Sequence, residues 1–346
     1  MSYLRSMIGA GLSIWLLTAC SKEEAVKPVS VPAEEVVDNK EETEDGKEVE
    51  AGFEAPLSGE LLEEETTQRA VAVTINNHPK ARPQSGLAEA DIVLEMLAEG
   101  SVTRLLAIYQ SEQPEKIGPV RSSRDYFIDL ANGYDAFYVS HGYSPDAKSK
   151  LDAGEIDHIN GMQYDGSLFN RSSERRAPHN SYITWANIEK GAEMVSASMD
   201  TPPSANDFVK ELQVGNSSDS IAKEFTVSYY NDASFTSTYT YDEGTNAFHR
   251  SIKGEQTKNN EDERPVELRN IVIMEAKHKI VDDVGRRTID LESGGNALLF
   301  QQGTVQEIEW QNEDGRLVPY SNGEPIKLLP GKTWIHLVPE LSFASY

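Results

Sequence analysis

The chain has a single cysteine, Cys20, among its 346 residues. Beyond that position no disulfide, thiolate nucleophile or cysteine-ligated zinc site is possible, because each of them needs a cysteine side chain. Envelope enzymes that acylate through cysteine, such as sortases and L,D-transpeptidases, are therefore excluded. The one thiol must be explained by the residues around it.

Long apolar stretches are also absent. The run Met7–Leu17 covers eleven residues, and no other stretch approaches the ~20 apolar residues that a membrane-spanning helix needs. Arg5 precedes this run, and the small pair Thr18-Ala19 follows it directly before Cys20. A positive segment, a short apolar run and small residues form the layout of an export signal. We therefore predict a signal peptide at 1–19.

The letters Leu17-Thr18-Ala19-Cys20 resemble the lipobox of bacterial lipoproteins, whose cysteine receives a diacylglyceryl thioether. Two fatty-acyl chains of the palmitate type hold a protein stably at a bilayer, whereas one chain holds it only marginally. The resemblance implies that Cys20 carries a lipid anchor and that the protein lies on the extracytoplasmic face of the cell membrane. The alternative is an ordinary secretory signal with a chance cysteine.

Basic residues are scarce, and the formal net charge is −25. Residues 21–68 hold 16 Asp and Glu against 4 Lys, and residues 69–346 carry a net charge of −14. So acidic a segment, with few aromatics, cannot bury enough apolar surface to fold, so we predict a disordered tether at 20–68. Nucleic-acid binders show the opposite charge balance, so we expect no nucleic-acid partner.

Composition divides the rest of the chain into two parts. From 69 to 200, short apolar runs alternate with helical patterns, which predicts a mixed α/β domain. The segment 201–222 has two prolines near its start and no hydrophobic periodicity, which is typical of a linker. From 223 to 346, alternating β-branched and aromatic residues separated by turns predict antiparallel hairpins. The predicted fold class is α+β, with an N-terminal α/β domain and a mostly antiparallel β C-terminal domain.

The stretch TINNHPKARP places Asn76, Asn77 and His78 at the carboxyl end of a predicted strand. Sheets in α/β proteins commonly present ligand-binding groups at this position. His78 could act there as a general base, a metal ligand or a hydrogen-bond donor. Alternatively, the amides only cap the turn and His78 satisfies backbone groups.

The stretch GPVRSSRDYF opens a predicted helix with Ser122 and Asp125 at capping-box spacing. Arg121 and Arg124 flank its amino terminus, where free N–H groups and the helix dipole favour an anion. An acidic ligand group could bind there. Alternatively, Asp125 already supplies the negative charge, and the arginines pair with nearby carboxylates.

The stretch NRSSERRAPHN concentrates Arg171, Arg175 and Arg176 just before His179. The guanidinium fork suits carboxylate or phosphate groups, although a solvated basic loop has the same composition. His78 and His179 each lie beside asparagine and proline, so the two could converge on one site. The sequence alone does not place them together.

These stretches, with TRLLAIYQS, LLFQQG and LLPGKTWIHLVP, resemble the YerB-type lipoprotein family of Gram-positive bacteria over residues 69–339. The resemblance implies an N-terminal and a C-terminal domain of unknown function, tied loosely to the cell envelope. Glu309, before Trp310, departs from the glycine-tryptophan-basic pattern associated with the family. Positions that match the family are Asn77, His78, Pro79, Arg82, Pro83, Gly86, Asp91, Arg104, Gly118, Pro119, Arg121, Arg124, Pro178, His179, Trp310 and Trp334.

The sequence contains no complete catalytic motif. Gly331-Lys332-Thr333 matches the end of a Walker A loop, but Ile326 stands where that motif needs its first glycine. No G-x-S-x-G occurs either. We therefore expect a non-enzymatic lipoprotein, without cofactor or metal, that binds an acidic envelope ligand or a cell-wall or envelope protein. Its candidate ligand-binding residues are Asn77, His78, Arg82, Arg104, Arg121, Arg124, Arg176 and His179.

Two rival hypotheses remain open. The first is a cell-wall hydrolase or transferase that uses His78 or His179 as acid/base or metal ligand, beside Asp91 or Glu95. The second is a solute-binding lipoprotein, which would need two similar α/β lobes around a cleft, and the β-rich second half speaks against it.

Overall fold

The structure, a computed structural model, describes residues 52–209 and 220–346. Residues 51–346 make up one compact unit. The predicted signal peptide, Cys20 and the first part of the predicted tether lie outside the described residues. In the ranges that are described, no helix is long and apolar enough to cross a membrane.

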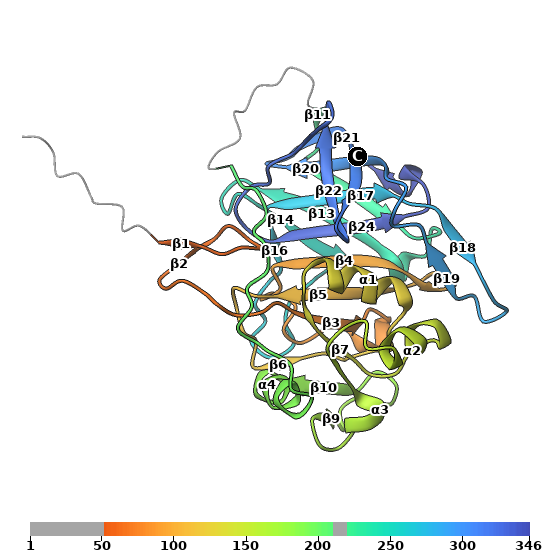
Figure 1. Cartoon of the computed structure of the whole chain (residues 1–346). Helices are drawn as coiled ribbons and strands as arrows, with labels where there is room; N and C mark the ends of the chain where they lie inside the picture. The colour runs from red at the N-terminus through yellow and green to blue at the C-terminus, as the bar shows by residue number, and fades with distance from the viewer. Residues whose placement is uncertain (1–51, 210–219) are drawn as a thin grey trace, which may run out of the picture. The chain divides into compact units, whose positions relative to one another are not determined.

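A twelve-stranded sheet runs through the unit and positions everything else (Figure 1). Strand β11 (Ser220–Ile221) pairs with β21, off the main path. In spatial order the other strands are β23 (Glu324–Pro325), β22 (Arg316–Ser321), β21 (Thr304–Glu313), β20 (Gly295–Gln301), β17 (Asn270–Glu275), β24 (Thr333–Val338), β4 (Ile92–Glu99), β5 (Val102–Tyr109), β3 (Val71–Asn76), β7 (Phe137–Ser140) and β8 (His158–Asn160).

Smaller elements surround this sheet. The six-stranded sheet contains β12 (Glu224–Ser228), β13 (Thr236–Asp242), β14 (Ala247–Ile252), β15 (Glu255–Gln256), β16 (Glu267–Leu268) and β25 (Ala344–Ser345). A three-stranded sheet contains β6 (Lys116–Ile117), β9 (Phe169–Arg171) and β10 (Ser181–Thr184). The helices are α1 (Asp125–Gly133), α2 (Pro145–Asp152), α3 (Gly161–Tyr164) and α4 (Trp185–Met194), with 3₁₀ turns η1 (Pro79–Ala81), η2 (Ala233–Phe235) and η3 (Leu341–Phe343).

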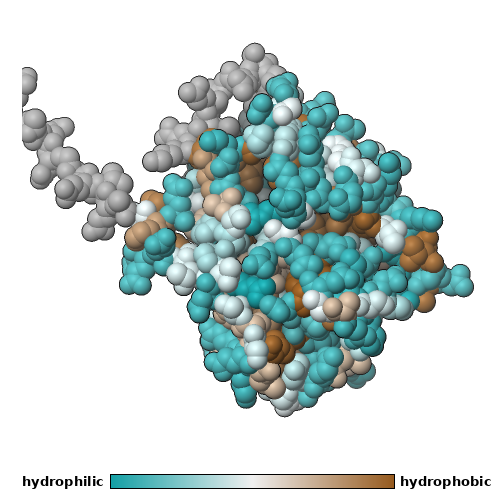
Figure 2. Space-filling view, in the orientation of Figure 1, coloured by the Kyte–Doolittle hydropathy of each residue, from teal (hydrophilic) through white to brown (hydrophobic). Residues whose placement is uncertain are grey.

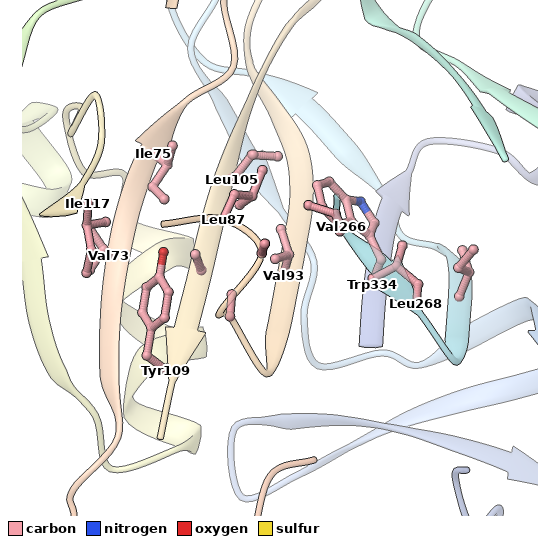
Figure 3. Packing of buried hydrophobic residues seen from close by; sticks show 14 of the residues in the cluster. Val73, Ile75, Leu87, Val93, Leu105, Tyr109, Ile117, Val266, Leu268 and Trp334 are labelled. Carbon is pink, nitrogen blue, oxygen red and sulfur yellow. The ribbon is translucent and has the colours of Figure 1, made fainter. Parts of the chain in front are cut away.

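Both faces of the central strands of the large sheet, β17, β24, β4, β5 and β3, are buried, which explains their apolar residues. All six residues of β3 are buried: Val73 and Ile75 belong to one hydrophobic cluster and Ala72 to the other. Figure 3 shows Val73 and Ile75 with side chains of β5, β4 and β24 in the first cluster. That cluster includes residues of α4 and the six-stranded sheet, and the second includes residues of α1 and α2. Strands covered on both faces read as continuous apolar runs.

The predicted fold class needs one correction. The structure is mostly β, and residues 69–200 form four short helices among many strands rather than a clear α/β domain. Runs such as DIVLEML do not distinguish a strand from a helix by periodicity, and this one lies in β4. The antiparallel hairpins predicted from residue 223 onward are present in β12–β13–β14 and β20–β21–β22.

The predicted tether is also too long. Residues 53–54 and 61–62 pair as the ribbon β1 (Phe53–Glu54) and β2 (Leu61–Leu62). Between these strands Leu57 is fully buried in the second hydrophobic cluster, and Gly331 donates its backbone N–H to the carbonyl of Ser58 at 2.7 Å. A few apolar residues with buried partners are enough to order this segment, although the surrounding charge predicted disorder.

The two predicted domains share the large sheet. Strand β24, near the carboxyl terminus, lies between β17 and β4 and runs parallel to both. The segment 201–209 has almost no regular structure, and it packs through Phe208 and the Asn206 backbone. Whether 69–200 and 223–346 fold as separate domains stays a prediction, but their strands form one continuous sheet.

One exposed apolar patch belongs to the ribbon of β18 (His278–Ile280) and β19 (Arg287–Ile289). Ile280, Val281 and Val284 are exposed there, and Figure 2 shows hydrophobic atoms over this ribbon at the right of the view. Scattered exposed apolar residues are normal on a protein surface. This patch lies apart from the predicted site residues in the sequence.

Candidate functional site

The candidate site lies where three parallel strands end. Strands β3, β7 and β8 run parallel to one another, so their carboxyl ends share one edge of the sheet. His78 follows β3 closely, and His141 follows β7. The backbone of Arg121 joins these two ends: its N–H donates to Thr74 at 2.8 Å and its carbonyl accepts from the His141 N–H at 2.9 Å. Ligand-binding groups commonly occupy this position in sheets with parallel strands.

His78 and His179 meet at this edge. Their rings stack with centroids 4.5 Å apart and an interplanar angle of 23°. The Asn76 side chain contacts both residues: its Oδ1 accepts the His78 backbone N–H at 3.0 Å, and its Nδ2 lies 2.9 Å from Nδ1 of His179. The structure thus brings together two histidines that the sequence could only suggest as neighbours.

The hydrogen bonds define which ring nitrogens carry protons. Because Asn76 Oδ1 accepts a backbone N–H, its Nδ2 must be the group that donates to His179 Nδ1. The Lys80 backbone N–H donates to Nδ1 of His78 at 3.1 Å. In each neutral imidazole the proton is therefore on Nε2. Both rings offer an N–H donor at Nε2 and no free lone pair.

Both rings are neutral near pH 7. Partial burial lowers the pKa of His78, and the positive charges of Lys80, Arg82 and Arg121 lower it further. Partial burial also lowers the pKa of His179, with additional lowering by His78 and Arg121. An anion bound against the rings would oppose these effects, because negative charge stabilises the protonated form.

Arg121 is the cation that the protein leaves unpaired here. Its side chain is half-buried and makes no ion pair or hydrogen bond to the residues that the structure describes. Burial lowers its pKa to about 10, and the neighbouring charges of Arg104 and Arg171 contribute. Since no carboxylate of the described residues forms an ion pair with Arg121, its positive charge is not neutralised by direct contact there.

His141 and Arg171 border the site, and the sequence analysis missed His141. Arg171 Nη2 donates to His141 Nε2 at 2.8 Å, so His141 Nδ1 carries the proton that it shares with Ser181 Oγ at 2.7 Å. Arg171 also pairs with Asp165 at 3.0 Å. His141 follows a predicted strand directly, as His78 does. This position in the sequence could have identified His141 as a candidate site residue.

Gly161 makes room for His141. A Cβ at this position would lie 2.1 Å from Nδ1 of the His141 ring. We expect Gly161→Ala to displace the ring, break the Arg171–His141 bond and lower stability by about 1–3 kcal/mol, as overpacking usually does. Thermal and urea unfolding measure this effect. Met162→Ala, at the exposed neighbouring position, is the control, with a change within about 0.5 kcal/mol; equal effects would contradict the role of Gly161.

Four of the predicted ligand-binding residues are used inside the protein. Asn77 is buried and donates to Glu95 at 2.9 Å and to Thr103 at 2.8 Å. Arg82 donates to the Asn77 side chain at 3.1 Å and to the Ser234 carbonyl at 2.8 Å. These bonds connect the NNHPKARP turn with the six-stranded sheet.

The other two residues are Arg104 and Arg124, which share Glu99. Arg104 bonds this carboxylate at 2.8 Å, and Arg124 forms an ion pair with its other oxygen. Asp125 lies in the first turn of α1. For Arg124 the alternative reading of this stretch, pairing with a nearby carboxylate, is the one observed, whereas Arg121 in the same stretch forms no ion pair within the described residues.

Arg176 is exposed, and its side chain forms no hydrogen bond or ion pair with other described residues. Its neighbour Arg175 has the structural role: it donates to the carbonyls of Ala81 at 2.8 Å and Pro83 at 2.7 Å, and to the Tyr182 hydroxyl at 2.7 Å. Arg175 thus holds the loop that carries His179 against the turn that carries His78.

The carboxylates named in the catalytic hypothesis contact neither His78 nor His179. Asp91 accepts from Ser111 and the Gln110 backbone, and Glu95 pairs with Arg250. Within 52–209 and 220–346, no three His, Cys, Asp or Glu side chains group as metal ligands. The arrangement offers donors to a bound anion, and the enzymatic hypothesis stays a prediction without an observed acid/base pair.

Comparisons with known proteins identify relatives. Two family models match, "Protein of unknown function (DUF3048) N-terminal domain" at 57–198 and the corresponding C-terminal domain at 225–335. "Putative lipoprotein YerB" of Bacillus subtilis (strain 168) is 46% identical over 295 residues, which are 85% of this chain and 88% of that protein. The crystal structure of the YerB protein from Bacillus subtilis has a TM-score of 0.78 at 45% identity and covers 85% of this chain and 99% of that chain. The chain therefore belongs to the YerB-like family, with its paired DUF3048 N- and C-terminal domains.

Proposed function

We propose that the chain is a lipid-anchored extracytoplasmic protein that binds an acidic polymer of the cell envelope through His78, Arg121 and His179. The observation that carries this proposal is a set of N–H donors with no acceptor among the described residues: the Nε2–H groups of His78 and His179 and the guanidinium of Arg121. Phosphate and carboxylate oxygens accept such bonds, and bonds between ionised groups are roughly twice as strong as neutral ones.

The location rests on the sequence and on a relative. Cys20 lies in a lipobox-like stretch after a short apolar run, and the similar Bacillus subtilis protein is named a lipoprotein. Lipid on Cys20 would hold the folded unit at the membrane surface, where envelope polymers are present. Mass spectrometry of the membrane-extracted protein would test this, because an intact leader with a bare Cys20 would contradict it.

The charge distribution favours specific rather than diffuse binding. Residues 69–346 carry a net charge of −14, so the body as a whole repels anions. An anion can be held only where cationic and N–H groups are concentrated and not internally paired. Arg121 meets this condition, whereas Arg104 and Arg124 do not because both bond Glu99.

Arg121→Ala tests the site. We expect the variant to bind inorganic phosphate about tenfold or more weakly than the parent, because a hydrogen bond from a charged donor contributes about 1.5–3 kcal/mol. Isothermal titration calorimetry measures the affinity, and NMR signals of His78 and His179 should shift as phosphate binds. Thermal unfolding should change little, because the side chain has no bond to other described residues.

Arg176→Ala is the matched control. It removes the same charge from the exposed part of a nearby loop, so we expect phosphate affinity to stay within about twofold of the parent, as for a screened surface charge. Equal weakening by both substitutions would show diffuse attraction and refute the site. Displacement of phosphate by purified wall polymer would support a polymer ligand, whereas displacement only by an envelope protein fraction would point to a protein.

A further inference from the structure

A separate cavity of ≈ 470 Å³ is lined in part by the NNHPKARP turn. One wall comes from residues 79–84, and the other comes from Ser234 and residues 250–258 around the turn between β14 and β15. Its volume is within the ~300–1,000 Å³ of ordinary small-molecule sites. Because both halves of the chain line it, the cavity exists only when they are packed together.

Cations dominate the charged lining. Arg82, Arg250, Lys253 and Lys258 line the cavity, against one carboxylate, Glu255. Two of these cations are already neutralised: Arg250 pairs with Glu95 at 2.9 Å and Lys258 pairs with Glu263 at 2.7 Å. Arg82 and Lys253 form no ion pair within the described residues.

These two unpaired cations converge on one residue. Arg82 Nη1 donates to the Ser234 carbonyl at 2.8 Å, and Lys253 Nζ donates to the Ser234 hydroxyl at 3.0 Å. Two carboxylates partly offset these cations: Glu95 and Asp232 act on Arg82, and Asp232 also acts on Lys253. Asp232 is already bonded to Ser101 and the Ser234 backbone. The Lys253 ammonium has three N–H groups. One of them bonds the Ser234 hydroxyl, so the others can donate to a bound anion.

The lining also has an apolar part and a buried polar side. Pro79, Pro83 and the buried side chain of Ile252 supply apolar surface. Arg250 is only 1% exposed, and its Nε has no hydrogen-bond partner. A few polar groups within a partly apolar lining are the usual composition of a small-molecule site.

We propose that this cavity binds a small organic anion, with its carboxylate or phosphate beside Arg82 and Lys253 and its apolar part against Pro79, Pro83 and Ile252. The proposal does not depend on the function proposed for His78, Arg121 and His179, which uses other side chains. The Lys253 backbone has a φ of 53°, in a region that L residues other than Asn and Asp occupy uncommonly.

The test uses phenyl phosphate as the probe and NMR of the purified protein as the readout. We expect saturable shifts of the Ile252 methyl groups and of the Lys253 and Gln256 amides. Lys253→Glu should weaken this binding by about tenfold or more, through lost attraction and added repulsion. Lys279→Glu, the same change at an exposed lysine of β18, should leave it within about twofold.

Further variants separate the two proposed sites. Arg121→Ala should retain the Ile252 and Lys253 shifts while losing those of His78 and His179. Benzyl alcohol, which has the ring without the charge, should not saturate the cavity signals. Shifts confined to His78 and His179, or equal weakening by Lys253→Glu and Lys279→Glu, would overturn the proposal. Lys253→Gln removes the charge without reversing it and should unfold at the same temperature as the parent. Weaker phenyl phosphate binding by this variant would then not come from a folding defect.

Discussion

Arg250→Met is expected to lower the free energy of unfolding by about 3–5 kcal/mol, the usual cost of breaking a buried ion pair from one side. The side chains of Arg250 and Glu95 are 2% and 1% exposed, and they meet at 2.9 Å. Methionine keeps much of the length and apolar stem of arginine, so the loss would report charge rather than volume. The Glu95 carboxylate would remain in the interior without its cation.

The surroundings of this pair explain why the effect should be large. Arg250 also donates to Thr257 at 2.9 Å and lies 4.5 Å from the centre of the Trp334 ring. Although burial opposes ionisation of Glu95, the charge of Arg250 and the hydrogen bond from Thr103 keep its pKa below the ordinary value. The pair connects β4 with β14, so it joins the two halves of the chain.

Urea unfolding followed by tryptophan fluorescence measures this loss. Arg264→Met is the control, because Arg264 is 43% exposed in its pair with Glu112 and surface pairs contribute about 0–1 kcal/mol. The double variant Glu95→Gln with Arg250→Met should recover part of the stability, since it removes both charges. Equal losses for Arg250→Met and Arg264→Met would contradict the argument.

Local sequence patterns predicted the strand ends of the candidate site, but the contacts between its loops depend on the tertiary structure. His78 could be predicted to follow a strand, because TINNHP places polar residues directly after an apolar run. Its stacking on His179 depends on Arg175, which holds one loop against the other. The sequence has no local signal for a contact between distant loops.

The arginines show why composition alone overestimates a ligand site. Arg104, Arg121 and Arg124 look alike in the sequence, but only Arg121 lacks a bond to a carboxylate among the described residues. The difference comes from Glu99 at the end of β4, which takes two of the three charges. Free and internally paired arginines are distinguished only when strand pairing is known.

The buried network around Glu95 was beyond sequence reasoning. Glu95, Arg250 and His336 belong to β4, β14 and β24, which come from distant parts of the chain. The position of β24 between β4 and β17 brings His336 beside Glu95. An alternating strand pattern predicts burial, but not which strand pairs with which.

His336 has the second large expected effect, on the dependence of stability on pH. It is fully buried, with Nε2 2.7 Å from the Tyr239 hydroxyl, Nδ1 3.1 Å from the Tyr229 hydroxyl and Glu95 at 3.8 Å. Burial lowers its pKa to about 4, although Glu95 opposes the shift and Arg250 adds to it. The folded protein therefore holds this imidazole neutral at pH values where the unfolded chain binds a proton.

Stability should consequently fall as the pH decreases from about 6.5 to about 4, and His336 should account for roughly 3 kcal/mol of the loss. The sign follows from proton binding: in this window the unfolded state binds more protons, so acid favours unfolding. Urea unfolding at several pH values should show a shallower dependence for His336→Gln than for the parent, whatever its absolute stability. His158→Gln, at a partly exposed position, should keep the parent slope. The comparison should be made between pH 6.5 and 5. In this window Glu95 stays ionised, because its pKa is lowered and its protonation begins only at lower pH. Parallel slopes for the parent and His336→Gln in this window would disprove the assignment.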